Sequence, residues 1–414
     1  MNEAKQKFRL TSLERAWILY DVGNSAFVLL VATLIPIFFN ALAEGGGLSS
    51  VEYLAYWGYA ASAVTVITAV LSPILGTLAD TRNFKKPIFI FCVAVGVIGC
   101  CAMGMASAWL PFLLIFIFAK VGFSGSLVFY DSMLSDVTVP DRMDEVSSKG
   151  YAWGYIGSCV PFVVCLALVL GAGSIGISQM TALNLALFIT AAWWLVTTLP
   201  LLRQYKQVHF VEVQEHAIRQ SFARIGHTLR HLKEDRQVFW FLLAFFCYID
   251  GVYTIIDMAT AYGTALGLDT TGLLLALLVT QIVAFPSALV FGRLSGQYPS
   301  GTLIPVCIAA YAGIALFAFF LKHQWQFWVL AVVVGMFQGG IQALSRSHFA
   351  KIIPPEKSGE YFGLFDICGK GASFLGTMIV SVGSQLTGSA NVGVGSLIVL
   401  FIVGFVLFRV SDQK

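Results

Sequence analysis

Long apolar stretches, separated by short polar or glycine- and proline-containing breaks, run along almost the whole chain. About 20 consecutive apolar residues are long enough to cross a bilayer as an α-helix. By that criterion the sequence predicts twelve membrane-spanning helices, at 17–40, 53–79, 86–106, 109–135, 151–171, 180–202, 238–262, 270–294, 301–321, 325–349, 361–385 and 393–409. We therefore expect an all-α membrane protein with twelve transmembrane helices.

Composition agrees with this class of protein. Hydrophobic residues make up 58% of the 414-residue chain and charged residues 11%, with a mean hydropathy of +0.81. Soluble domains carry about 25% charged residues, so a soluble globule is excluded. The net charge of +3 is small, and nucleic-acid binding has no support. The eight cysteines lie in apolar spans without CxxC spacing, so we expect no disulfide framework, metal site or cofactor.

Lysine and arginine are distributed unequally between the two sides that twelve spans would create. If the N-terminus is cytoplasmic, 23 of the 25 basic residues fall in cytoplasmic segments or at cytoplasmic helix ends. Lys120 lies within a span, and Lys322 falls on the other side. Cytoplasmic loops of membrane proteins carry such a positive excess. The asymmetry therefore predicts a multi-pass protein with both termini in the cytoplasm.

A repeat relates the two halves of the sequence. The segment 140–158 recurs at 355–373, an offset of 215 residues, with the same order of proline, acidic, basic, glycine and serine positions. The turn 76–80 (GTLAD) recurs in altered form at 292–296 (GRLSG). Internal repeats of this kind are typical of transporters built from two similar halves.

The repeat predicts two pseudo-symmetric six-helix bundles, at 1–202 and 238–414, joined by a cytoplasmic connector at 203–237. Apolar residues in the connector recur at helical spacing: Phe222, Ile225, Leu229 and Leu232. This spacing predicts an amphipathic helix that lies on the inner membrane surface.

Two six-helix halves, a cytoplasmic connector and a Gly-x-x-x-Asp turn after the second span resemble the major facilitator superfamily. The resemblance implies a central cavity lined by spans 1, 4, 7 and 10. Ionisable residues lie in those spans: Asp21, Lys120, Asp131, Asp250, Asp257 and Arg346. A charge at the bilayer centre costs roughly 2.5–3.5 kcal/mol, so such residues usually mark a solute path.

A narrower resemblance is carried by the segments 17–27 (WILYDVGNSAF), 140–157 and 360–373 (EYFGLFDICGKGAS). They are similar to the autophagy-related vacuolar amino-acid effluxer family, which also has bacterial members. That resemblance implies export or release of neutral amino acids. The chain length and the lack of an Asn-x-Ser/Thr sequence favour a bacterial member in the inner (plasma) membrane.

A zwitterionic solute needs a cation for its carboxylate and an anion for its ammonium group. We expect Lys120 or Arg346 to bind the carboxylate of the solute. We expect Asp21 or Asp131 to bind its ammonium group, with Asn24 one turn from Asp21 as a further substrate-binding residue. The alternative is that Asp21 and Asn24 only cap neighbouring helix ends.

Asp250 and Asp257 are seven residues apart and therefore share one face of span 7, which contains no basic residue. Unpaired carboxylates on a buried face bind protons more readily than they do in water. Both are therefore candidates for proton coupling. Asp250 is favoured because it lies nearer the midplane and repeats the Tyr-Asp pattern of span 1. Pairing with Lys120 is the alternative.

The turn between spans 2 and 3 carries a candidate gate, made of Gly76, Asp80, Arg82, Lys85 and Lys86. The superfamily resemblance implies that the aspartate and the basic residues latch the two halves together in an outward-open state. Asp80 is expected to cap the start of span 11. Gly296 takes the place of the aspartate in the second half, so the latch would be one-sided.

Span 11 carries two further charges. Asp366 and Lys370 are four residues apart, which places them on the same helix face within reach of each other. We interpret them as a structural ion pair rather than a substrate site.

Together these patterns predict a secondary active transporter of small polar solutes, which exports amino acids or related zwitterions by alternating access with proton coupling. The expected partners are a small-molecule substrate, protons and the lipid bilayer, and the protein is expected to be a monomer. The alternatives are a non-transporting sensor or scaffold, and an importer of a different small metabolite. The sequence has no Walker motif, His-Glu metal motif or nucleophile elbow, so we do not expect an enzyme.

Overall fold

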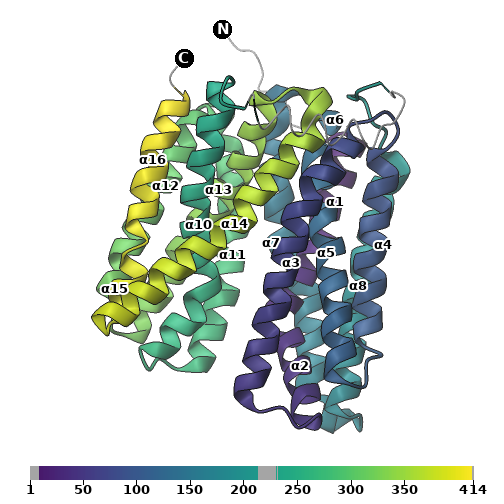
Figure 1. Cartoon of the computed structure of the whole chain (residues 1–414), viewed down its shortest axis with the longest axis vertical. Helices are drawn as coiled ribbons and strands as arrows, with labels where there is room; N and C mark the ends of the chain where they lie inside the picture. Colours follow the sequence, from purple (N-terminus) through teal and green to yellow (C-terminus); the bar gives the residue numbers. More distant parts are fainter. Residues whose placement is uncertain (1–8, 213–229, 231, 413–414) are drawn as a thin grey trace.

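The computed structural model describes residues 9–212, 230 and 232–412, and these are almost entirely helical (Figure 1). The helices of the first half are α1 (Ser12–Ala32), α2 (Leu34–Gly45), α3 (Ser50–Ala79), α4 (Lys85–Met103), α5 (Trp109–Ser132), α6 (Leu134–Val137), α7 (Pro140–Leu170) and α8 (Gln179–Gln204). Those of the second half are α10 (Arg236–Ala265), α11 (Thr270–Leu294), α12 (Ser300–Phe319), α13 (Gln324–Ile352), α14 (Ser358–Thr387), α15 (Ala390–Gly395) and α16 (Ile398–Asp412). Short 3-10 turns occur at Ala172–Ile175 and Pro355–Lys357.

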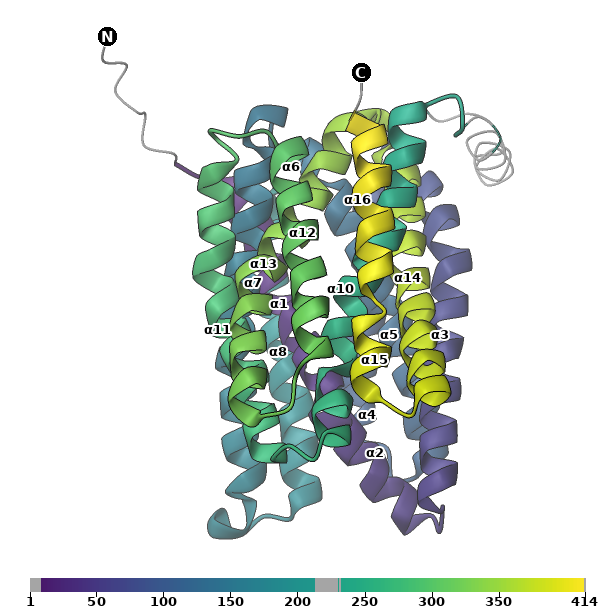
Figure 2. The same ribbon diagram turned by 90° about the vertical axis from the view of Figure 1, so that its left-hand side faces the viewer.

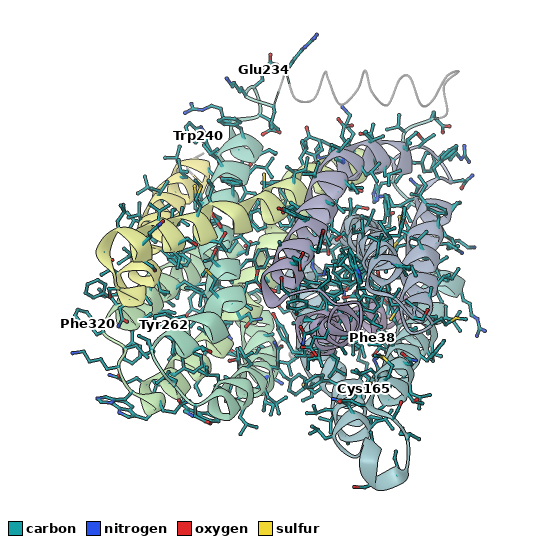
Figure 3. All side chains as sticks on the ribbon, turned by 60° about the horizontal axis from the view of Figure 1, so that its bottom comes forward. Phe38, Cys165, Glu234, Trp240, Tyr262 and Phe320 are labelled. Carbon is teal, nitrogen blue, oxygen red and sulfur yellow. The ribbon has the colours of Figure 1, made fainter. Side chains whose placement is uncertain are left out.

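Most of these helices are long enough to cross a membrane. Within the described residues, eleven spans are long and apolar enough to do so, and α1 with α2 and α15 with α16 each count as one. The remaining predicted span, 361–385, lies within the 30-residue helix α14. Large apolar side chains such as Phe118 (66% exposed) and Phe320 (61%) cover the outside of the molecule (Figure 3). Exposed apolar surface of this extent is what lipid contact requires.

Two predicted boundaries differ from the structure for identifiable reasons. The span expected at 17–40 is broken at Thr33, because Pro36 lacks the N–H that would bond to the carbonyl of Ala32. The span expected at 151–171 begins earlier, at Pro140, which suits the first position of a helix. The polar residues 140–150 therefore lie on a helix face rather than in a loop.

The helices form two groups that stand side by side (Figures 1 and 2). In one, α1 packs on α7 and α8, and α4 packs on α5 and α8. In the other, α10 packs on α14 and α16, and α13 packs on α11 and α12. The groups meet where α3 crosses α14 and where α7 meets α11 and α13. The amphipathic helix expected around Phe222, Ile225 and Leu229 falls in residues 213–229, outside the described part of the chain.

The start of α1 and the end of α16 lie at the same end of the molecule (Figure 1). We call this end the terminus side. The turn between α3 and α4, the starts of α7 and α14, and the described beginning of the connector at 205–212 lie there too, whereas the α2–α3 and α7–α8 turns lie at the opposite end. This placement brings the candidate gate residues together at the terminus side.

Candidate functional site

A cavity of about 400 Å³ lies between the two groups of helices. It is lined by residues of α1, α5, α7, α10, α11, α13 and α14. Its ionisable lining residues, tyrosines apart, are Asp21, Lys120, Asp131, Asp257, Arg346 and Asp366. Ligand pockets of proteins typically measure about 300–1,000 Å³, so the cavity is large enough for a small polar solute.

Arg346 of α13 reaches from the second half into the first. Its Nη1 donates a hydrogen bond to Asp131 Oδ1 at 3.0 Å and lies 3.6 Å from Asp21 Oδ2. Its Nε and Nη2 donate to the hydroxyl and the carbonyl oxygen of Ser147, at 2.9 and 3.0 Å. The arginine is only 2% exposed. These contacts, which we call the Arg346 clamp, tie α13 to α1, α5 and α7 across the boundary between the halves.

Aromatic rings of the first half surround the same guanidinium. Its carbon lies 4.3 Å from the ring centre of Tyr151, 4.7 Å from Trp17 and 5.3 Å from Tyr130. Trp17 stacks on Tyr130 and donates its indole N–H to the Tyr130 carbonyl at 2.9 Å. Cation–π contacts are strongest when, as here, the cation is desolvated. Asp21, Asp131 and Arg346, which the sequence suggested for opposite ends of a solute, therefore lie together, with the one cation beside both carboxylates.

The Asp131–Arg346 pair has a relation to the internal repeat. The two residues are 215 positions apart, which is the offset of the repeat. Positions related by a two-fold axis can touch each other only near that axis. The pair therefore marks the centre of the boundary between the halves.

The other two substrate-binding candidates, Lys120 and Asn24, also line the cavity. The Lys120 ammonium group lies 4.8 Å from the Phe123 ring centre and 5.9 Å from Phe27. The Asn24 side chain donates to the Tyr20 carbonyl at 3.2 Å and to Asp21 Oδ1 at 3.4 Å. Asn24 thus supports the position of Asp21 from within the same helix, and its amide lines the cavity beside it.

Asp250 and Asp257 lie on nearly the same face of α10, as expected, but they have different surroundings. Asp257 lines the cavity. Asp250 is fully buried against α14, where its Oδ1 accepts hydrogen bonds from the Gly376 N–H at 2.8 Å and the Thr254 hydroxyl at 3.4 Å. The cause is local packing, because α14 covers α10 at Asp250 whereas the cavity opens beside Asp257. Asp250, which the sequence favoured for proton coupling, is therefore packed between helices, and Asp257 is the one of the two that lines the cavity.

The expected Asp366–Lys370 pair cannot be described in full, because the Lys370 side chain lies outside the described residues. Asp366 Oδ2 accepts a hydrogen bond from the Ser72 hydroxyl at 2.7 Å. Ser72 belongs to α3 and Asp366 to α14, so this contact joins the two halves at the edge of the cavity.

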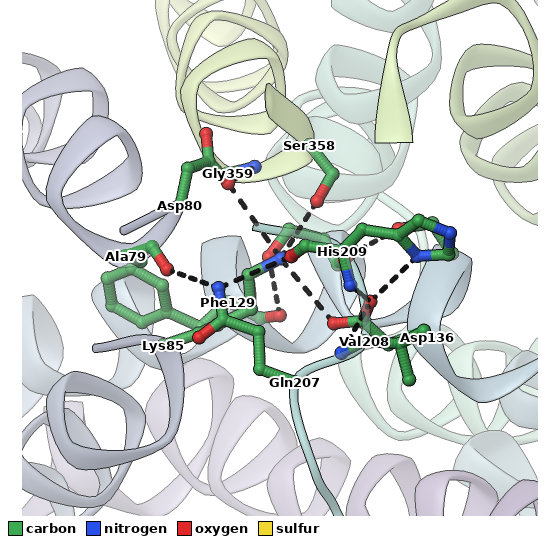
Figure 4. Close-up of polar contacts among 12 residues, drawn as sticks. Ala79, Asp80, Lys85, Phe129, Asp136, Gln207, Val208, His209, Ser358 and Gly359 are labelled. Atoms are coloured by element: carbon green, nitrogen blue, oxygen red, sulfur yellow. Dashed lines mark hydrogen bonds and ion pairs between the residues drawn. The ribbon is translucent and has the colours of Figure 1, made fainter. Parts of the chain in front are cut away.

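Asp80 and Lys85 connect the halves at the terminus side (Figure 4). Asp80 accepts hydrogen bonds from the backbone N–H groups of Gly359 (2.7 Å) and Glu360 (2.8 Å), at the start of α14. Helix N-termini attract such anions. Lys85 Nζ donates to the Ser358 hydroxyl at 2.8 Å and lies 3.8 Å from Asp80 Oδ1. Both charged side chains are fully buried.

The other three gate candidates differ in what they contact. A Cβ atom on Gly76 would collide with the Gly359 carbonyl, so Gly76 allows α3 to approach α14 closely. Arg82 instead pairs with Glu212 of the connector at 3.4 Å, and Lys86 donates to the Tyr205 carbonyl at 3.4 Å. Their described partners therefore belong to the connector, not to the second half.

Sequence reasoning missed Asp136, which anchors the connector beside Lys85 (Figure 4). Its carboxylate lies 3.7 Å from Lys85 Nζ and accepts hydrogen bonds from the Tyr205 hydroxyl (2.6 Å) and the His209 backbone N–H (2.9 Å). Burial and the neighbouring carboxylate raise the pKa of Tyr205, which keeps its phenol a donor. Asp136 follows the fourth span in a polar segment, and nothing in its spacing distinguishes it from other loop acids.

Sequence and structure comparisons place this geometry among known proteins. Residues 12–141 and 135–414 match the family described as "vacuole effluxer Atg22 like". The uncharacterized MFS-type transporter YxiO of Bacillus subtilis (strain 168) is 42% identical over 411 residues, which cover 98% of this chain and 96% of that protein. Autophagy-related protein 22 of Coccidioides immitis (strain RS) is 25% identical over 315 residues, 65% of this chain, but these span only 51% of the fungal protein.

Among solved structures, the major facilitator transporter FucP in its outward conformation superposes with a TM-score of 0.73 at 16% identity, covering 97% of this chain and 98% of that one. A likeness at this identity concerns the fold alone. It confirms the predicted all-α membrane architecture of the major facilitator type.

Proposed function

Because the chain belongs to the vacuole effluxer Atg22 like family, we propose that it exports amino acids or related zwitterions by alternating access. Proteins of this kind are transporters rather than enzymes. One observation carries the proposal: the central cavity contains groups of both signs, and the arginine among them joins the two halves. A solute that competes for that arginine would also act on the contact between the halves.

The proposed mechanism begins at the Arg346 clamp. An amino-acid carboxylate offers the guanidinium the same two-oxygen partner that Asp131 offers. When the carboxylate of the solute binds Arg346, the ammonium group of the solute binds the carboxylates of Asp131 and Asp21. The cross-boundary bond is then replaced by bonds to the solute, and the two halves can rock apart at the terminus side. Solute binding and gate opening become one event.

A second, smaller cavity supports a solute with an apolar side chain. It measures about 60 Å³, lies within the second half and is mostly apolar, with Met258, Phe327 and Val334 among its lining residues. It shares Gln281 and Gln338 with the central cavity. Among the described residues, the Gln338 carboxamide oxygen has no hydrogen-bond partner although the side chain is only 5% exposed. A solute N–H group would satisfy this oxygen.

We propose that the terminus side is the cytoplasmic side of a bacterial inner membrane. The distribution of lysine and arginine supports this orientation. The contacts of Asp80, Lys85 and Arg346 would then close the cytoplasmic side, so the structure corresponds to a state that receives or releases solute outside. Asp80 and Lys85 would act as its gate, with Gly76 providing the close approach of α3 and α14.

We propose that Lys120, which also lines the cavity, contacts the solute carboxylate together with Arg346, and ligand binding tests this role. We expect neutral amino acids to raise the unfolding temperature of the purified protein, because a ligand at 100 times its Kd stabilises by about 2.7 kcal/mol. Lys120→Ala should weaken binding of carboxylate-bearing ligands by roughly 10- to 100-fold, the value of one charged hydrogen bond. Lys322→Ala, which removes an exposed lysine outside the cavity, should bind as the parent does. Unchanged affinity in Lys120→Ala would reassign Lys120 to an internal contact.

Proton coupling is proposed at Asp257, the carboxylate of α10 that lines the cavity. Asp257→Asn should retain exchange of internal for external solute but lose net transport driven by a pH gradient, because the amide cannot carry a proton across. Asp250→Asn, on the same helix but packed on α14, is the matched control and should keep both activities if it folds. Transport by Asp257→Asn that still follows the pH gradient would remove Asp257 from the coupling step.

A further inference from the structure

The two halves meet at two related interfaces on the terminus side. The first lies between α3 and α14, where Asp80 is, and the second lies between α11 and α7. At the first interface, Asp80 bonds to the start of α14. At the second interface the position matching Asp80 is Gly296, which has no carboxylate to offer the start of α7. The α7–α11 contact there is a close approach of Gly292 to Ser148. Sequence reasoning therefore predicted a one-sided latch.

The structure contains an ion pair at this second interface. Lys351 of α13 donates a hydrogen bond to Asp144 Oδ2 of α7 at 2.6 Å. The side chain of Asp144 is 8% exposed and that of Lys351 is 26% exposed, so the pair is shielded from solvent on one side. Asp144 is on the part of α7 that the sequence had suggested was a loop.

The repeat relates these two residues to the first interface with their charges rearranged. At an offset of 215, Asp144 corresponds to Gly359, whose N–H is bonded by Asp80. At the same offset, Lys351 corresponds to Asp136, the carboxylate beside Lys85. At the first interface the carboxylate is that of Asp80, on the turn after α3, whereas at the second interface it is that of Asp144, on α7. Lys351, a cation, occupies the position that matches the anion Asp136.

The ion pair also continues the Arg346 clamp toward the terminus side. One turn further along α7, the Ser147 hydroxyl donates to the Ala343 carbonyl at 2.8 Å and accepts from Arg346. Residues three and four positions apart lie on one helix face, so Asp144, Ser147 and Tyr151 form a continuous polar seam against α13.

We propose that Asp144 and Lys351 form a second latch, the rearranged counterpart of the Asp80 contact, which holds α7 against α13 at the terminus side. The inference rests on the proposed alternating access, since a latch matters only if this side opens. Opening must break the pair, which places both side chains in water. The pair therefore contributes to the balance between the closed and open forms, and the second half does not depend on the Asp80 contact alone.

Charge exchange tests the latch without any solute. Spin labels on cysteines introduced at the exposed positions Asp141 and Gln297, in a chain whose native cysteines are replaced, report the α7–α11 distance. Lys351→Asp should increase the population with the longer distance by roughly three- to tenfold, as expected for a partly shielded ion pair. Asp144→Lys should do the same. The double exchange, Asp144→Lys with Lys351→Asp, should restore the parent distribution.

The control is Lys149→Gln, which removes the 2.7 Å ion pair with Glu145 within α7 and should leave the distances unchanged. If the charge-reversed chains do not fold, Asp144→Asn and Lys351→Gln give the same test, because each should shift the population and the double variant should shift it no further. Unchanged distances in the single variants, or additive shifts in the double, would overturn the latch. Since no solute is present, this outcome is independent of whether the protein transports amino acids.

Discussion

Replacing Arg346 by lysine is expected to lower the rate of solute exchange in proteoliposomes by at least roughly 30-fold. Lysine keeps the positive charge but lacks the planar fork that bonds Asp131 and Ser147 at once. Disrupting one partner of a buried, hydrogen-bonded charge pair costs about 2–5 kcal/mol. The change would therefore remove both the proposed solute contact and the bond to Asp131 that we propose couples the solute to the gate.

Two further variants separate this effect from a loss of stability. Arg409→Lys, an exposed arginine near the end of α16, should exchange solute at the parent rate. Arg346→Gln with Asp131→Asn and Asp21→Asn removes all three charges of the clamp, so none of them is left buried without its counter-charge. This triple variant should fold and still fail to exchange solute. Parent-like exchange by Arg346→Lys would exclude the Arg346 clamp from the mechanism.

The second large effect is expected for Asp80→Asn. The neutral amide loses the charged character of the two bonds to the start of α14, and Lys85 loses one of its two neighbouring carboxylates, keeping Asp136. Charged hydrogen bonds contribute about 1.5–3 kcal/mol each, so the closed form should lose roughly 10- to 100-fold in population relative to the open form. Hydrogen exchange of backbone amides measures this opening. Protection should fall at the start of α14 and also in α7 around Asp144, on the other interface between the halves.

The control for Asp80 is Asp235→Asn. Asp235 also caps a helix on the terminus side, but its 3.2 Å bond goes to the Val238 N–H of its own helix α10. Only the first turn of α10 should then exchange faster. If Asp80→Asn likewise affects only the start of α14, Asp80 is a helix cap and not a gate.

Features that depend on local chemistry could be predicted from the sequence. Apolar length located the helices, and the Gly76–Asp80 spacing pointed to a contact with the start of α14. The helix break at Thr33 and the early start of α7 were missed although Pro36 and Pro140 cause them. Both prolines were visible, but hydropathy alone does not say where a continuous apolar or polar stretch changes backbone geometry.

Pairing across the boundary was not predictable from residue type. The sequence identified Asp21, Asp131 and Arg346 as charges in cavity-lining helices, but it could not show that they bond to one another. One signal was available, because Asp131 and Arg346 are separated by the repeat offset of 215. For Asp250 and Asp257, the spacing in the sequence was not enough to predict what surrounds each side chain. Their spacing places them on nearly the same helix face, yet the neighbouring helix differs at the two levels.

Solute counterflow in proteoliposomes tests alternating access around the Arg346 clamp. Vesicles containing the protein are loaded with an unlabelled neutral amino acid that shifts its unfolding temperature, and a trace of the labelled compound is added outside. Alternating access predicts a transient accumulation of label above its equilibrium level, which saturates with internal solute and is lost in Arg346→Lys. A protein that binds the amino acid but produces no counterflow would be a sensor, and alternating access around the Arg346 clamp would be contradicted.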